Sequence, residues 1–184
     1  MRITYNAPVV LTFALISGAV LLGDTLFGGV FTTTIFSAPG SFSVFSPFDY
    51  VRIVAHIAGH ANLAHLMGNF MLILLIGPLL EEKYGSWPLC IMILVTAATT
   101  GILNAAFFET GVLGASGIVF MMIILSSITE ADDGEIPLTF ILVIALYVFT
   151  EIVGSFAKDG VSQFSHIMGG ICGSIFGFLL MRNR

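Results

Sequence analysis

Six apolar segments, separated by charged or glycine- and proline-rich breaks, are the feature that most constrains the fold of this 184-residue chain. A helix needs roughly 20 largely apolar residues to cross the hydrocarbon core of a bilayer. Segments of about this length occupy 7–28, 62–80, 86–107, 115–130, 136–156 and 162–181. With 57% hydrophobic and 9% charged residues, the composition lies outside the range of soluble globular domains. We therefore expect an all-α, polytopic membrane protein in which residues 1–184 form a single six-span domain.

The longest break between the predicted spans runs from Gly29 to Ala61. It contains Pro39, Pro47, several aromatic residues and Arg52. The stretch is too long for a tight turn and apolar enough to lie at a membrane surface. We expect a long interfacial first loop.

The charges exclude one class of partner and predict an orientation. Six Lys and Arg against eleven Asp and Glu give a net charge of −5, and no basic run offers a surface for nucleic acid. Six spans place both termini on one side, together with the second and fourth connections. That side carries Arg2, Lys83, Arg182 and Arg184, and the other carries Arg52 and Lys158. Because Lys and Arg favour cytoplasmic loops, this bias predicts cytoplasmic termini.

Four polar residues from distant parts of the chain are expected at one level of the bundle. The second, fourth and sixth spans run in the same direction, so residues near their starts lie on one side. Ser116 opens the fourth span, His166 lies about one turn into the sixth, and His65 and Asn69 occupy the first two turns of the second. Polar groups are costly inside a bilayer, so this convergence indicates a functional site.

The residue types indicate nucleophilic catalysis. A serine hydroxyl becomes a good nucleophile when an imidazole within hydrogen-bond reach removes its proton. Ser116 is the candidate nucleophile and His166 the candidate base. No acidic residue accompanies His166 in its span, which favours a Ser-His dyad over a triad. The Ser116 backbone N–H, the Asn69 amide and the His65 ring are candidate donors to an oxyanion.

Four motifs and one arginine occur in a fixed order between residues 50 and 181. They are Arg52, H-x4-H-x3-N at 60–69, E-x-K-x-G-S at 81–86, G-x-S-G at 114–117, and His166 followed by Gly169 and Gly173. In order and spacing they resemble the rhomboid intramembrane serine proteases, and the match is to the six-span core of bacterial members. That resemblance implies a rhomboid-like helical bundle with a long first loop.

The resemblance also implies roles for individual residues. Ser116 would be the nucleophile, His166 the base, and His65 and Asn69 would stabilise the transition state, without metal or cofactor. The supporting residues would be His60, Gly114, Gly117, Phe120, Arg52, Glu81, Gly169 and Gly173. Phe120 stands where bacterial members often carry tyrosine, so it can stack on the histidine but lacks the hydroxyl. Val51 stands where the family usually has tryptophan before the arginine.

The substrates and location follow from the same resemblance. The family cleaves single-span or multi-span membrane proteins in or near their spanning segments, and bacterial members lie in the inner, cytoplasmic membrane. Together with the glycines between Gly154 and Gly160, the resemblance predicts that the fifth span and the loop after it form a substrate gate. Gly169, Gly173 and Gly177 form a small-residue face that we expect to pack against the fourth span rather than in a dimer.

Two other interpretations remain open. A catalytically silent rhomboid-like protein would bind membrane segments without cutting them, although retention of Ser116 and His166 counts against it. A metal or haem site could use His56, His60, His65 and His166. Against it, no H-E-x-x-H motif or acidic ligand is present, and His60 and His65, five residues apart, are expected on different helix faces.

Overall fold

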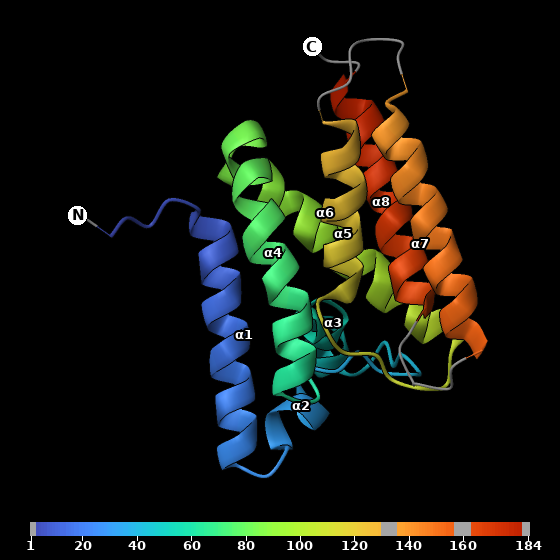
Figure 1. Ribbon diagram of the computed structural model, residues 1–184. Coiled ribbons are helices and arrows are strands. Elements are labelled where there is room, and N and C mark those ends of the chain that lie inside the picture. The colour runs from blue at the N-terminus through green and yellow to red at the C-terminus, as the bar shows by residue number, and fades with distance from the viewer. Residues whose placement is uncertain (1–2, 130–135, 157–162, 182–184) are drawn as a thin grey trace.

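The structure, a computed structural model, describes residues 3–129, 136–156 and 163–181, and the regular structure in these ranges is helical apart from one isolated β-bridge. The elements are α1 (Pro8–Leu26), α2 (Val30–Thr34), α3 (Pro47–Ala55), the 3-10 helix η1 (His56–Ala58), α4 (Leu63–Tyr84), α5 (Ser86–Phe107), α6 (Ser116–Ile128), α7 (Leu138–Phe156) and α8 (Gln163–Met181). Figure 1 shows the long helices side by side in one bundle.

The six predicted segments coincide with α1, α4, α5, α6, α7 and α8 to within a few residues. Within the described ranges, α1, α4, α5 and α8 are long and apolar enough to cross a membrane, whereas α6 has only 13 residues. The predicted all-helical membrane bundle is confirmed, and the crossing of the bilayer by all six helices stays a prediction. The acidic run at 130–135 and residues 157–162, which belong to the part of the predicted gate that follows the fifth span, lie outside the described residues.

Helix α4 continues past the charged run that was expected to end it. We predicted a break at Glu81, but this side chain is buried. Its carboxylate accepts hydrogen bonds from the backbone N–H groups of Val9 and Val10, at 2.9 and 3.0 Å, and from the Ser86 hydroxyl at 2.7 Å. The first N–H groups of a helix have no partner within it. Glu81 therefore satisfies the start of α1, and its charge does not require the helix to end.

The first loop contains three short helices. Helix α3 begins with Pro47 at its first position, where the missing N–H costs nothing, and carries the buried Asp49 in its first turn. The Asp49 carboxylate accepts a hydrogen bond from the Ser43 N–H at 3.0 Å. Figure 1 shows α2 and α3 near the end of the bundle where α4 begins.

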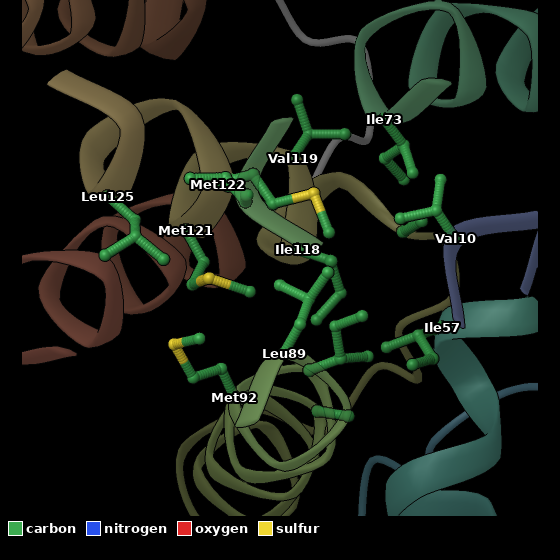
Figure 2. Packing of buried hydrophobic residues seen from close by; sticks show 14 of the residues in the cluster. Val10, Ile57, Ile73, Leu89, Met92, Ile118, Val119, Met121, Met122 and Leu125 are labelled. Carbon is green, nitrogen blue, oxygen red and sulfur yellow. The ribbon is translucent and has the colours of Figure 1, made fainter. Parts of the chain in front are cut away.

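The core is centred on α6, which packs most extensively against α8 and also contacts α4, α5 and α7. Figure 2 shows Val10 from α1, Ile73 from α4 and Leu89 from α5 gathered around the side chains of α6. Ile118 and Leu125 of α6 are fully buried. A 13-residue helix enclosed in this way can begin below the surface of the bundle, which puts its first residues inside the protein.

Glycines allow α8 to approach α6 closely. A Cβ atom at Gly169 would lie 2.0 Å from the Gly117 carbonyl oxygen, and one at Gly173 would lie 2.4 Å from the Met121 carbonyl oxygen. At Gly177 it would lie 2.7 Å from the end of a side chain of α6. The predicted packing of this small-residue face against the fourth span is confirmed.

Candidate active site

Ser116 is the first residue of α6 and faces a cavity. Gly114, two residues earlier, has φ = 115°, a left-handed conformation that favours glycine, and Ala115 caps the helix. The cavity has a volume of about 860 Å³, and Ser116 and His65 both line it. The turn at Gly114 therefore needs a residue that readily adopts this conformation, and it places the partly exposed Ser116 at the start of α6.

His166 lies in the first turn of α8, beside the start of α6. A Cβ atom at Gly117 would lie 3.1 Å from the Ser165 carbonyl oxygen, so the residues next to Ser116 and His166 are in direct contact. The His166 side chain is buried, at 8% exposure, and its ring centroid lies 4.5 Å from that of Phe120 with the planes at 37°. The two rings are therefore in contact, tilted rather than parallel. The close α6–α8 packing thus brings the candidate nucleophile and base to the same end of two touching helices.

His65 and Asn69 reach the same turn from α4. Asn62 caps this helix, accepting a hydrogen bond from the His65 N–H at 2.8 Å. A Cβ atom at Gly114 would lie 2.7 Å from His65 Cε1 and 3.7 Å from Asn69 Nδ2. The four residues predicted to converge therefore surround one turn of backbone.

His60 supports this arrangement from below α4. Its Nε2 accepts hydrogen bonds from Asn69 Nδ2 at 3.0 Å and from the Ala115 N–H at 3.4 Å, while Nδ1 faces the Ala58 carbonyl oxygen at 3.3 Å. This pattern assigns the proton to Nδ1. Burial, reinforced by the charge of neighbouring His65, lowers the pKa of His60 to about 4. A neutral His60 can therefore orient the Asn69 amide and hold the backbone next to Ser116.

His56 is buried and packs between α3 and α5. Nδ1 lies 2.9 Å from the Ile53 carbonyl oxygen and Nε2 lies 3.3 Å from the Thr100 hydroxyl. Its own carbonyl oxygen accepts a hydrogen bond from the Gly114 N–H at 3.0 Å. Burial lowers the pKa of His56 to about 4, so the ring is neutral near pH 7.

One argument used against a metal site is wrong. We expected His60 and His65 on different faces of one helix, but His60 precedes the helix, which begins after Asn62. The two rings are neighbours, with centroids 5.0 Å apart. Both nitrogens of His60 nevertheless face protein partners. No group of three His, Cys, Asp or Glu residues suited to a metal ion occurs in the ranges that the structure describes.

The first loop reaches the segment before Ser116. Ala38 and Val112 form an antiparallel bridge, with N···O distances of 2.8 and 3.2 Å. Arg52 donates from Nε to the Ser37 carbonyl oxygen at 2.7 Å and pairs with Asp49 at 3.4 Å. Arg52 thus lies outside the cavity and holds the segment that pairs with the serine loop.

Asn104 is a buried polar residue of the cavity that the sequence analysis did not single out. It lies on α5, is 2% exposed, lines the cavity and donates a hydrogen bond from Nδ2 to the Thr110 carbonyl oxygen at 2.9 Å. A buried amide within an apolar span is costly unless it is paired. An asparagine within the predicted third span therefore already indicates, from the sequence alone, a buried polar contact at this position.

Comparison with known proteins finds one family. The Rhomboid domain matches residues 47–183, which is most of the chain. Rhomboid-related protein 1 of Caenorhabditis elegans is 30% identical over 169 residues, covering 84% of this chain and 47% of that protein. RHOMBOID-like protein 4 of Arabidopsis thaliana is 29% identical over 130 residues, covering 66% of this chain and 32% of that protein. RHOMBOID-like protein 7 of the same plant is 29% identical over 129 residues, covering 66% and 40%.

The chain spans less than half the length of each of these three relatives. The domain match includes all helices from α3 onward and leaves out α1 and α2. Several of the helices that the structure describes are long and apolar enough to span a bilayer, so the protein is an integral membrane protein. With a Rhomboid domain over most of its length, the chain belongs to the rhomboid family.

Proposed function

We propose that this protein is an intramembrane serine endopeptidase that hydrolyses peptide bonds in or near the spanning segments of other membrane proteins. The observation that carries the proposal is the close contact between the starts of α6 and α8. Gly117, next to Ser116, packs against Ser165, next to His166. Polar side chains are costly among apolar helices, so a serine and a histidine brought together there support a role in reaction chemistry.

The geometry suits a two-step acyl transfer. His166 removes the proton from the Ser116 hydroxyl as its oxygen attacks the substrate carbonyl carbon. The peptide bond breaks, His166 gives the proton to the leaving amine, and an acyl-enzyme remains. A water molecule, deprotonated by the same histidine, then hydrolyses the ester and restores Ser116. The Phe120 ring packs against the His166 ring, tilted by 37°, and would help to orient it.

The oxyanion of each tetrahedral intermediate requires donors that are already in place. His65 and Asn69 lie against Gly114, two residues before the nucleophile. One N–H of the Asn69 amide is engaged with His60, which fixes the plane of the amide and directs its second N–H. A cavity of about 860 Å³ has room for an extended peptide and for the water that hydrolysis consumes.

The proposal extends to the setting of the enzyme. Residues 1–184 would form one six-span domain, with α1 held to it through Glu81. The termini would be cytoplasmic, in the inner membrane of a bacterium. Substrates would be single-span or multi-span membrane proteins, which enter from the lipid beside α7. The reaction needs no metal or cofactor.

The first experiment is cleavage of a generic single-span substrate by detergent-purified protein, together with labelling by a fluorophosphonate serine probe. Ser116→Ala should lose both cleavage and labelling, and His166→Ala should lose cleavage. Ser126→Ala is the matched control on the same helix, because its hydroxyl donates to the Ile123 carbonyl oxygen at 2.9 Å within that helix, and it should keep both.

Two outcomes would redirect the proposal. Labelling without cleavage would mean that the chosen segment is not a substrate, and a panel of spanning segments would follow. A folded protein that neither cleaves nor takes the probe would favour the binding-only alternative. In that case, retention of membrane segments by wild type and by Ser116→Ala should be equal.

A further inference from the structure

The segment that leads to Ser116 is anchored at nearly every second residue. Val112 exchanges two backbone hydrogen bonds with Ala38. The Gly114 N–H donates to the His56 carbonyl oxygen at 3.0 Å, and the Ala115 N–H donates to His60. The position of Ser116 therefore depends on a chain of anchors that begins several residues before it.

Asn104 supplies the first anchor of this chain. Its Nδ2 donates to the Thr110 carbonyl oxygen at 2.9 Å and lies 3.4 Å from the Pro39 carbonyl oxygen. These two carbonyls belong to different loops, the one before Ser116 and the first loop. If the amide were reversed, its own oxygen would face both carbonyl oxygens, so the contacts determine its orientation. One buried amide thus joins two loops with its two N–H groups.

The two loops approach too closely to be held apart by side chains. A Cβ atom at Gly40 would lie 2.0 Å from the Glu109 carbonyl oxygen. One at Gly111 would lie 2.8 Å from the Ala38 carbonyl oxygen. The backbones therefore touch on both sides of the Asn104 contacts, and a loss of those contacts would be felt along the whole segment.

We infer that Asn104 is a positioning residue, which rests on the proposed function of Ser116 as the nucleophile. It acts through the Thr110 and Pro39 carbonyl oxygens, which tie the serine loop to the first loop and set where α6 begins. It does not act on the substrate carbonyl, because its amide hydrogens are directed to those two loops. Since a misplacement of about 1 Å at a reacting group can cost roughly 100-fold in rate, a distant anchor can control reactivity.

The test compares Asn104→Asp, which keeps the shape but replaces the donor group by an acceptor, with Asn104→Gln, which keeps the donors. The first readout is hydrogen exchange of the peptide covering 109–115, which does not depend on activity. The second is the rate of fluorophosphonate labelling of Ser116. Asn104→Asp should exchange faster in this peptide only and label about 10-fold more slowly, within the range of effects expected for a misplaced nucleophile. Asn104→Gln should restore most of both.

Two further variants separate positioning from general instability. Thr96→Val is the matched control, because Thr96 is equally buried on α5 and its hydroxyl forms no hydrogen bond to either loop. It should leave exchange and labelling as in wild type. Gly40→Ala leaves Asn104 intact but forces the loops apart at Glu109, so it should reproduce the faster exchange and slower labelling. It decides the question if Asn104→Asp does not fold.

The inference would be overturned by wild-type exchange and labelling in Asn104→Asp or, where that variant does not fold, in Gly40→Ala. It would also be overturned if Asn104→Gln were as impaired as Asn104→Asp. If wild type itself does not label, the proposed function fails, but the exchange comparison still decides whether Asn104 holds the loop.

Discussion

Gly169→Ala should separate the two helices that carry the candidate dyad. The new Cβ atom would lie 2.0 Å from the Gly117 carbonyl oxygen, and contacts shorter than 3.0 Å are essentially not observed for Cβ atoms. The backbones must therefore move apart by at least 3.0 − 2.0 = 1.0 Å. Because Gly117 follows Ser116 and Gly169 is one turn beyond His166, this movement acts directly on the dyad. A displacement of about 1 Å predicts a loss of roughly 100-fold in turnover.

Two other glycines on α8 and one on α1 provide a graded comparison. The same calculation gives 3.0 − 2.4 = 0.6 Å for Gly173→Ala, and for Gly177→Ala the nearest atom ends a flexible side chain. We therefore expect activity and melting temperature to fall most for Gly169, less for Gly173 and least for Gly177. Gly18→Ala is the control, because no atom lies within 4 Å of its Cβ position. Alanine is favoured over glycine in a helix by about 1 kcal/mol, so this variant should be as stable as wild type or more so.

The assay is substrate turnover and thermal unfolding of each variant in the same detergent. If Gly169→Ala turns over substrate and melts like wild type, α8 does not depend on this contact with α6. If Gly18→Ala loses as much as Gly169→Ala, the loss comes from the substitution of glycine in general rather than from the contact.

Three more predictions follow from side-chain contacts described above. Burial lowers the pKa of His56 and of His60 from 6.5 to about 4, so between these pH values the unfolded state binds more protons than the folded state. The free energy of unfolding should therefore fall as the pH falls through this window, by about 2 kcal/mol for each histidine at pH 5. A free energy of unfolding that does not change with pH would contradict this prediction. Glu81→Gln places an amide NH2 group against an N–H donor at the start of α1, so the free energy of unfolding in denaturant should fall by about 2 kcal/mol and hydrogen exchange at the Val9 amide should be faster. Unchanged stability would show that this carboxylate does not hold α1. Phe120→Ala removes the ring that packs against His166 and should slow labelling by the fluorophosphonate probe about 3- to 10-fold. Phe120→Tyr keeps the ring and should label at least as fast as wild type. Equal labelling rates for wild type and both variants would rule out a role for the ring.

The sequence predicted the long helices from the lengths of its apolar segments, and the convergence of Ser116 and His166 from the direction in which successive spans run. Helix ends were predicted less well. A break was predicted at Glu81 because a run of charged residues begins there, and only the packing of α1 against α4 reveals the partners of this carboxylate. The prediction that His60 and His65 lie on different helix faces was wrong for a local reason, because the helix begins after Asn62, between the two histidines.

The loop contacts could not have been predicted from local patterns. The bridge between Ala38 and Val112 joins segments far apart in sequence, and neither has the alternating pattern of a strand. Asn104 was visible as a polar residue in an apolar span, but its two acceptors belong to irregular loops whose paths depend on the whole bundle. Sequence therefore indicates which residues carry the chemistry more readily than which residues hold them in place.

The E-x-K-x-G-S motif at 81–86 connects the end of α4 to the start of α1 and to the end of α6. Glu81 binds the first N–H groups of α1, and Lys83 donates to the Thr129 carbonyl oxygen at the end of α6, where a cation is favoured by the helix dipole. The Tyr84 hydroxyl adds a contact of 3.0 Å to the Thr129 hydroxyl. Helix α6 is thus held at its last turn by α4 and at its first turn by the anchored serine loop. Because α6 moves along its axis as one body, contacts of the motif with its last turn also fix the position of Ser116 at its first turn.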